Sequence, residues 1–291
     1  MRKVIAIDIG GTFIKYGVVD ESGNILKGEK TPTSLENLES FIGCIIEINE
    51  KYRKEFEIDG ISISVPGFVD IKTGNINACT NIKVIEGCNL KFILEKKFNL
   101  PVLVENDANC VALAEKFNGN AKECDDFICL TIGTGIGGGI FLNGGLIRGK
   151  EFKGGEFCYM ITKEKDGYKT CSQNASMTGL TNIYREYRSL DKNEKVLGEE
   201  VFAESEKNQE IKELINGWYS NMAIMIHNIA SILNPEKILI GGGISARKEF
   251  ISEIEEELNK IPYWKYVKCK VEVCKHKNNA GIIGAAYNYF Y

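Results

Sequence analysis

The residues best suited to chemistry lie in a segment that reads Pro-Val-Leu-Val-Glu-Asn-Asp-Ala-Asn, from Pro101 to Asn109. Its apolar first half predicts a strand and its second half a helix, so Asn106 and Asp107 fall where ligands bind in α/β proteins. A carboxylate there can accept the proton of an attacking hydroxyl, while Asn106 bonds a neighbouring hydroxyl. Asn or Asp before a helix is also an N-cap, which on local grounds is the commoner role.

Two glycine turns have the chemistry of a phosphate site. The first is Gly10-Gly11-Thr12, and the second begins at Gly133-Thr134-Gly135 and runs to Gly139. Residues without bulky side chains let backbone N–H groups approach a polyphosphate closely. Neither turn is a Walker A loop or a dinucleotide fingerprint, because no Gly-Lys-Ser/Thr follows and each turn leads into a strand. We therefore expect two hairpins to hold the phosphates of ATP from both sides.

Asp8 ends the strand that precedes the first turn. A carboxylate there suits Mg²⁺, bound through water because Mg²⁺ keeps much of its hydration shell; capping of the turn is a compatible plainer role. A third cluster, Gly241-Gly242-Gly243, follows the strand Lys237–Ile240, and a helix is predicted from Ala246 to Leu258. Its flat backbone could accommodate adenosine, with the helix N-terminus adding partial positive charge.

The elements that position these residues alternate between strand and helix, which predicts an α/β fold. The segment Ile5 to Thr12 has the same plan as Ile128 to Gly135: an apolar strand, a Gly/Thr turn and a second strand. Two such units predict a duplicated core with one copy in each of two lobes. We expect a smaller lobe of residues 1–118, completed by a C-terminal helix at 278–291, and a larger lobe of residues 119–277.

Length and composition fit this plan. The 291 residues suffice for two lobes, and 44% of them are hydrophobic. The net charge is −4 without a long basic run, which argues against nucleic acid or an anionic membrane as partner. No signal stretch precedes Val4, so a cytoplasmic protein is expected. Ten cysteines without a C-x-x-C pair predict no disulfides in a reducing compartment.

Taken together, the motifs resemble those of the ROK family, which includes sugar kinases of the actin-like (ribonuclease H-like) ATPase fold. The resemblance covers essentially the whole chain. The segments that carry it are Asp8 to Thr12, Val65-Pro66-Gly67 with Asn81, Glu105 to Asn109, Gly133 to Gly139, and Asn234-Pro235 through Gly241-Gly242-Gly243.

The resemblance implies an ATP-dependent sugar kinase that uses Mg²⁺ and forms a homodimer. By that resemblance Asp107 is the general base that activates the 6-hydroxyl of a hexose or N-acylhexosamine. Gly67, Asn81, Asn106 and Glu156 would hold the other hydroxyls. Glu156 follows Gly154-Gly155, a turn that can deliver a carboxylate to a sugar; as an isolated residue it would equally be a solvated loop acid.

The chain departs from the family in its zinc motifs. Many members carry Gly-Glu-x-Gly-His and a three-cysteine loop, which bind a structural zinc. Here Tyr159 stands where histidine is usual, and Cys171 is the one cysteine retained in the loop. A tetrahedral site cannot be built from this remainder, so no zinc is expected. Tyr159 becomes a candidate sugar contact, and Thr178 replaces a glutamate that touches the sugar in other members.

These changes fall on the C1–C2 side of the sugar, and they leave glucose, a β-glucoside and N-acetylmannosamine open as substrates. Two other functions are alternatives to a kinase. A catalytically silent sugar-binding sensor of the same family is the alternative, although it would not need Asp8, Asp107 and both glycine turns. A sugar-responsive repressor would carry an N-terminal helix-turn-helix domain, for which the start of the first strand at Val4 leaves no room.

Overall fold

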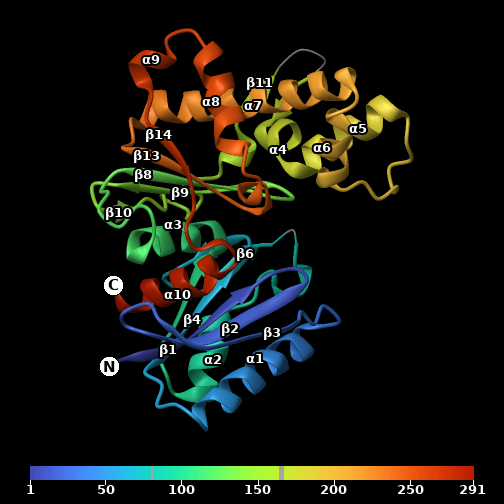
Figure 1. The fold of residues 1–291 in the computed structure, drawn as a ribbon. Helices are drawn as coiled ribbons and strands as arrows, with labels where there is room; N and C mark the ends of the chain where they lie inside the picture. Colours follow the sequence, from blue (N-terminus) through green and yellow to red (C-terminus); the bar gives the residue numbers. More distant parts are fainter. Residues whose placement is uncertain (80, 164–166) are drawn as a thin grey trace.

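The structure, a computed structural model, describes residues 1–79, 81–163 and 167–291. It has two lobes, each built on a five-stranded mixed sheet (Figure 1). The strands of the first sheet, in spatial order, are β3 (Ile25–Pro32), β2 (Phe13–Asp20), β1 (Lys3–Ile9), β4 (Gly60–Val65) and β7 (Val102–Asn106). Those of the second are β10 (Gly145–Leu146), β9 (Ile136–Leu142), β8 (Phe127–Ile132), β13 (Lys237–Gly241) and β14 (Lys270–Val273).

The two sheets have the same topology, which confirms the predicted duplication. In the first, β1 is antiparallel to β2 and parallel to β4, and β4 is parallel to β7. In the second, β8 is antiparallel to β9 and parallel to β13, and β13 is parallel to β14. Each predicted glycine turn joins the first two strands of its sheet, so the turns occupy equivalent places in the two lobes.

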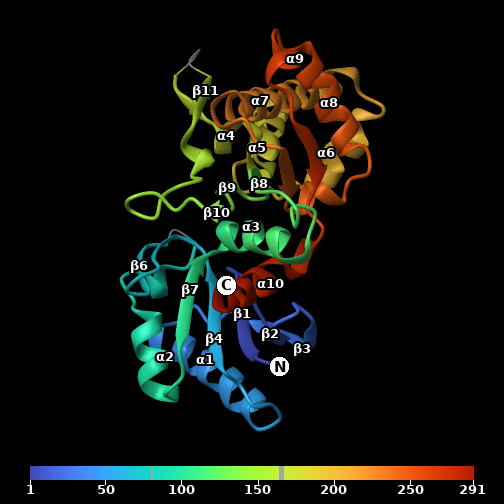
Figure 2. The same ribbon diagram turned by 90° about the vertical axis from the view of Figure 1, so that its left-hand side faces the viewer.

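Helices cover the sheets as Figures 1 and 2 show. In the first lobe α1 (Leu38–Arg53) and α2 (Leu90–Phe98) cover the outer face, while α3 (Asp107–Asn118) and α10 (Ala280–Phe290) lie between the sheets. The second lobe carries α4 (Cys171–Ala175), α5 (Met177–Arg188), α6 (Gly198–Ser205), α7 (Gln209–Leu233), α8 (Phe250–Lys260) and α9 (Trp264–Val267). Two short ribbons complete the fold: β5 (Phe68–Asp70) with β6 (Asn75–Ala78), and β11 (Ile161–Lys163) with β12 (Lys169–Thr170).

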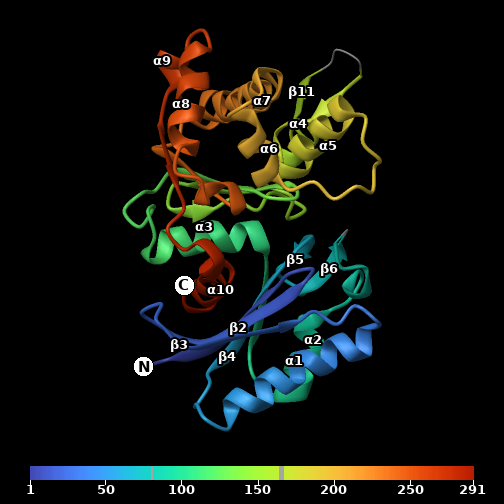
Figure 3. The ribbon, with the colours of Figure 1, turned by 45° about the vertical axis from the view of Figure 1, so that its right-hand side comes forward.

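Alternation along the first strand of each sheet separates two faces. On β1, Ile5 and Ile7 pack under α1 and α2, whereas Val4 and Ala6 pack on α10. The same parity places Asp8 on the inner face. On β8, Ile128 and Leu130 join the core around α7, whereas Phe127 and Cys129 join a cluster with Ala112 and Leu113 of α3. Helix α3 therefore lies against the inner face of the second sheet (Figure 3).

Two elements differ from the prediction: the edge strand β3 was missed, and the start of α8 was misplaced. The strand β3 was not predicted, because its residues alternate between half-buried and exposed and its sequence is mostly polar, as suits an edge strand. The helix predicted from Ala246 to Leu258 is wrong at its start. Gly243–Ala246 forms a 3₁₀ turn, Arg247 is extended, and α8 begins only at Phe250. No α-helix N-terminus therefore directly follows the third glycine cluster.

Helix α10 crosses α3 at very close range. A Cβ atom added to Gly284 would lie 1.7 Å from the carbonyl oxygen of Cys110, and one added to Gly281 would lie 2.2 Å from the carboxylate of Asp8. The first distance cannot be accommodated without moving a helix, because the contact is with backbone atoms, and the second would displace the Asp8 side chain. Among the described residues no helix is long and apolar enough to cross a membrane.

We predict that Gly284→Ala lowers the free energy of unfolding by about 1–3 kcal/mol, because the added methyl forces α10 away from backbone atoms of α3. Gly43→Ala is the matched control: Gly43 lies within α1 and a Cβ there meets open space. This control should be neutral or stabilising by up to about 1 kcal/mol through helix propensity. Urea unfolding measures both, and equal stability of the two variants would contradict the close contact.

Candidate active site

The start of α3 shows how its first polar residues are used. Asn106 is the N-cap, since its side-chain oxygen accepts bonds from the N–H groups of Ala108 at 2.9 Å and Asn109 at 3.1 Å. Its amide nitrogen donates to the carbonyl of Gly67 at 3.0 Å. Asp107 is the first residue of the helix and lines a cleft. Its Oδ1 also accepts a bond from the N–H of Ala108 at 2.9 Å, and the residue remains exposed to a ligand in the cleft.

Asp107 is exposed toward the cleft, while protein atoms crowd its other sides. This partial desolvation raises the pKa of its carboxyl group to about 6, with further contributions from the charges of Asp8 and Glu156. Burial likewise raises the pKa of Asp8, against the opposing effects of Ser64 and Lys15. The Ser64 hydroxyl donates to Asp8 at 2.8 Å, and the Lys15 ammonium lies 3.6 Å from its other oxygen.

The cleft has a volume of about 740 Å³ and is lined by residues of both lobes. Ten predicted site residues line it: Gly67, Asn81, Asn106, Asp107, Glu156 and Tyr159 of the sugar set, Gly133, Thr134 and Gly135 of the second phosphate turn, and Gly242 of the adenosine cluster. Six predicted residues are not part of its lining: Asp8, Gly10, Gly11, Thr12, Gly241 and Gly243. The structure thus brings the sugar set together with the second turn.

The glycines of the two turns and of strand β9 fall into two groups, according to what an added Cβ atom would meet. A Cβ added to Gly11 or Gly133 would meet open space, so packing within the protein does not require glycine there. The same is not true of β9, where a Cβ on Gly137 would lie 2.9 Å from Ala108 and one on Gly139 would lie 2.7 Å from Ala112. Gly137 and Gly139 therefore let α3 lie directly on the second sheet, and Gly11 and Gly133 leave room for a ligand.

Hydrogen bonds from distant segments hold both turns. The Thr33 hydroxyl donates to the carbonyl of Gly10 at 2.6 Å, and the Thr33 N–H donates to the carbonyl of Thr12 at 3.0 Å. In the second turn the N–H of Met177 donates to the carbonyl of Gly133 at 2.9 Å. The unpredicted strand β3, which ends at Pro32, thus delivers a residue that fixes the first turn.

The part of the cleft lined by the predicted sugar-binding residues includes the loop that carries Glu156. Burial raises the pKa of this carboxyl group, and the Cys158 thiol donates to its Oε2 at 3.4 Å. On the opposite wall Gly67 has φ +100°, and a Cβ there would lie 2.1 Å from the carbonyl oxygen of Ala78. Only glycine fits such a position, and its carbonyl is the group that orients Asn106.

Sequence reasoning missed several residues of this region, of which four carry polar or reactive groups close to predicted site residues. Lys15 lies opposite Asp8 in the register of β1 and β2, and Thr131 lies at the cleft end of β8. Cys158 and Gln173 line the cleft together with Glu156 and Tyr159. The Asp8–Lys15 pair could have been found by aligning the two strands about the glycine turn. Nothing in the local sequence points to the other three residues, which reach the cleft through the packing of separate elements.

The altered zinc region, residues 158–180, includes residues 164–166, which lie outside the described part of the chain. Thr178 lies in the first turn of α5 and is not part of the cleft lining, whereas Thr170, Ser172 and Gln173 are. No group of three or more His, Cys, Asp or Glu residues in the described ranges could hold a metal ion. The absence of zinc stays a prediction.

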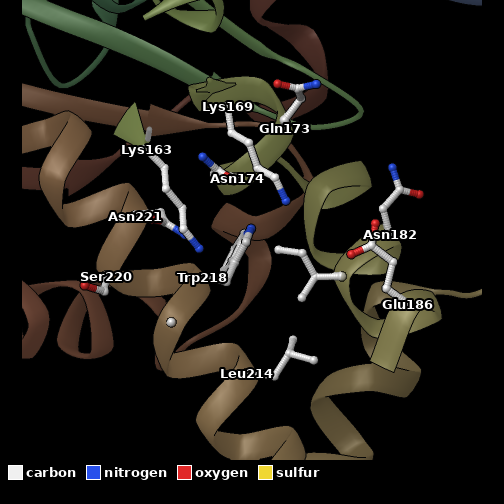
Figure 4. Close-up of a pocket in the computed structure, with 12 residues that line it drawn as sticks. Lys163, Lys169, Gln173, Asn174, Asn182, Glu186, Leu214, Trp218, Ser220 and Asn221 are labelled. Atoms are coloured by element: carbon white, nitrogen blue, oxygen red, sulfur yellow. The ribbon is translucent and has the colours of Figure 1, made fainter. Parts of the chain in front are cut away.

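A second cavity of about 660 Å³ lies beside the cleft in the larger lobe (Figure 4). Figure 4 shows Lys163 and Lys169 extending into this space near Trp218. The cavity shares Gln173 with the cleft but contains neither Asp107 nor a phosphate-turn glycine, so it is separate from the candidate active site. Its full lining is Lys163, Lys169, Gln173, Asn174, Asn182, Ile183, Glu186, Leu214, Gly217, Trp218, Ser220 and Asn221.

Comparison with known proteins assigns this arrangement. The model of the ROK family matches residues 4–289. The chain belongs to the ROK family. This ROK-family chain is 37% identical over 292 residues to a β-glucoside kinase of Listeria monocytogenes, which covers 99% of the chain and 97% of that relative. It is 32% identical over 294 residues to a β-glucoside kinase of Klebsiella pneumoniae, with 99% and 96% covered.

Solved structures agree. A ROK family protein from Streptococcus pneumoniae, in complex with sucrose, superposes with a TM-score of 0.88 at 32% identity and covers 99% of this chain and 97% of that one. A ROK family glucokinase from Streptomyces griseus, in complex with glucose and AMPPNP, gives 0.80 at 27% identity with 98% of both chains covered. The predicted two-lobed, actin-like ATPase fold is therefore confirmed for this ROK-family chain.

The raised pKa of Asp107 leads to a prediction that does not depend on activity. In a protein labelled with ¹³C at aspartate, the carboxyl resonance of Asp107 should titrate with a midpoint near 6, and it is assigned by its loss in Asp107→Asn. Glu156→Gln removes a like charge, so the midpoint should move to lower pH. A midpoint near 4 in the unaltered protein would contradict the crowded environment described above.

Proposed function

We propose that this ROK-family chain transfers the γ-phosphoryl group of ATP to the 6-hydroxyl of a glucose unit that carries a β-linked substituent at C1. The broader class, an ATP-dependent sugar kinase, follows from the family match and from the similarity to β-glucoside kinases and to a glucokinase solved with glucose and AMPPNP. The observation that carries the chemistry is Asp107, a carboxylate next to the N-cap residue and placed in a cleft between a glycine turn and polar side chains.

In the proposed reaction Asp107 accepts the proton of the sugar hydroxyl as the phosphoryl group moves to that oxygen. A pKa of about 6 leaves the carboxylate mostly ionised at neutral pH while making it a stronger base than an ordinary aspartate. Thr134 and Gly135 would donate backbone N–H groups to the phosphates from the larger lobe, with Gly11 and Thr12 on the other side. Such preorganised donors stabilise the charge that develops during phosphoryl transfer. The N–H groups of Gly133 and Gly10 instead hold the turns closed, since they donate to the carbonyls of Gly135 and Phe13, each at 3.0 Å.

The residues near Asp8 fit a magnesium ion that travels with ATP. Its carboxylate is partly exposed, sits beside the first turn and accepts a bond from Ser64. No cluster of three ligating side chains accompanies it within the described ranges, so water and phosphate oxygens would supply most of the coordination. When bound, the ion would neutralise phosphate charge. We place the adenosine along Gly241, Gly242 and Gly243, of which Gly242 lines the cleft.

Several features favour a C1-substituted glucose over unsubstituted glucose and N-acetylmannosamine. The wall formed by Cys158, Tyr159, Thr170, Ser172 and Gln173 carries no charged side chain and would face C1 and C2. The Tyr159 ring is 62% exposed in the cleft and offers an apolar surface to a second sugar ring. Two relatives are β-glucoside kinases. The pneumococcal structure holds sucrose, whose glucose is α-linked at C1, so it supports a substituent at C1 but not the β linkage.

The remaining expectations concern assembly and motion. We propose that residues 1–118 with 278–291, and residues 119–277, act as two lobes that close on ATP and sugar. Gly67, Asn81, Asn106 and Glu156 would hold the hydroxyls that do not react. We further propose that the protein acts in the cytosol as a homodimer.

The test of the proposed function is ADP release with ATP and Mg²⁺ across glucose, cellobiose, N-acetylmannosamine, N-acetylglucosamine, mannose and fructose. Cellobiose should give the highest kcat/KM, with the product phosphorylated at O6 of its non-reducing glucose. Asp107→Asn should lower kcat by about 10²–10⁴-fold because it removes the base. Preference for N-acetylmannosamine would replace the proposed substrate, and sugar binding without turnover would favour a catalytically silent sensor.

Tyr159→Ala tests the C1 side separately. We predict that it raises the KM for cellobiose by about 10-fold and changes the KM for glucose by less than about 2-fold, because only the substituted sugar reaches the ring. Tyr263→Ala is the control, since Tyr263 is 75% exposed and does not line the cleft. An equal loss for both sugars would show that Tyr159 does not contact the substituent.

A further inference from the structure

A carboxylate that does not line the cleft sits directly behind the candidate active site. Glu105, the next to last residue of β7, is 1% exposed. Its Oε1 accepts bonds from the N–H of Asn106 and the side-chain amide of Asn109, both at 2.9 Å. Its Oε2 accepts a bond from Arg148 Nε at 2.7 Å. The carboxylate therefore joins three groups, two of which belong to the segment that presents Asp107.

Arg148 comes from the other lobe. It follows β10 at the edge of the second sheet, and its side chain is 25% exposed. Besides the bond to Glu105, its Nη2 lies 3.4 Å from the side-chain oxygen of Asn288 in α10. One guanidinium thus connects a loop of the larger lobe with the catalytic strand and the C-terminal helix of the smaller lobe.

The loop that begins at Arg148 ends at Glu156, and its backbone is tightly constrained. The N–H of Gly154 donates to the carbonyl of Arg148 at 2.8 Å. A Cβ on Gly154 would lie 2.6 Å from the carbonyl oxygen of Ile147, and one on Gly155, which has φ +88°, would lie 2.4 Å from that of Gly138. Because the backbone at Gly154 and Gly155 has little room to move, a displacement of Arg148 would also move Glu156.

We propose that Arg148 is a positioning residue for sugar binding: its ion pair with Glu105 fixes the loop that carries Glu156 against the strand that carries Asp107. The pair sets the separation of the two carboxylates that face the sugar, one from each lobe. Neither Arg148 nor Glu105 lines the cleft, so both act through other residues. The inference rests on the proposed function, since it assumes that Asp107 and Glu156 bind one sugar.

The competing explanation is that the pair only stabilises the fold. A planar guanidinium with several donors fixes orientation as well as distance, which a point charge or an apolar contact does not. A role in stability alone would lower the melting temperature without selecting between the two substrates. A positioning role would weaken sugar binding and leave ATP binding unchanged, because the phosphate turns are held by other bonds, such as those of Thr33 and Met177.

The experiment compares Arg148→Met with the unaltered full-length protein. We expect kcat/KM for the best sugar of the panel to fall by about 10- to 100-fold, while the KM for ATP changes by less than about 2-fold. The matched control is Lys237→Met. Lys237 is 17% exposed, pairs with Glu272 at 3.1 Å and begins β13, whose other end leads to the cleft. This control should lose stability without a change in sugar kinetics.

Two further variants keep the test decisive. Arg148→Lys retains the positive charge but not the planar guanidinium group, so it should recover part of the loss in kcat/KM. It also serves as the test if Arg148→Met does not fold. Glu105→Gln combined with Arg148→Met should lose no more than the worse single variant, because the two residues act as one unit. Additive losses, or Arg148→Met with sugar kinetics within twofold of the unaltered protein, would overturn the proposal.

Calorimetric sugar binding separates this inference from the proposed function. If the unaltered protein binds a sugar but does not phosphorylate it, the kinase proposal fails, and the inference is then decided by the dissociation constant. Weaker sugar binding by Arg148→Met, with Lys237→Met unchanged, would support the positioning role even then. Equal sugar affinity of Arg148→Met and the unaltered protein would contradict it.

Discussion

The arrangement of the whole site depends on the packing of one helix between two sheets. Helix α3 begins with Asp107 and lies directly on β9, where Gly137 and Gly139 leave no side chain in its path. On its other side α10 approaches it through Gly284, whose Cα faces the backbone of Cys110. These contacts contain almost no free space, so the position of Asp107 relative to both glycine turns is determined by backbone packing rather than by a flexible loop.

The second feature of the site is the electrostatic environment of Asp107. Asp8, Asp107 and Glu156 come from three separate parts of the chain, and the charges of Asp8 and Glu156 together with desolvation raise the pKa of Asp107. Like charges held close together are costly unless a cation or a proton accompanies them. The Lys15 ammonium neutralises part of this charge at Asp8. In the proposed reaction a proton from the sugar hydroxyl and a cation bound with the nucleotide would neutralise the remainder.

Much of the fold could be read from the sequence because its signals are local. Strands with buried faces, such as β1 and β8, show in their apolar runs, and the repeated strand, glycine turn and strand shows the duplication. The edge strand β3 gave no such signal, since half of its surface faces solvent. The start of α8 was misplaced because Arg247 is extended rather than helical, which the apolar periodicity of the segment does not reveal.

The sequence by itself determined the family, the two turns and the segment that holds the proposed base, because each is a short run whose residue types have few other uses together. It could not choose between capping and catalysis for Asp107, since both roles need the same residue at the same place. The tertiary structure assigns the cap to Asn106, whose side chain is held by the carbonyl of Gly67, a residue with positive φ. It also decided which glycines face open space and which face α3, because that depends on what lies opposite each Cα. The ion pair between Arg148 and Glu105 is another feature that only the tertiary structure determines, since no local pattern relates residues 43 positions apart that meet between two lobes.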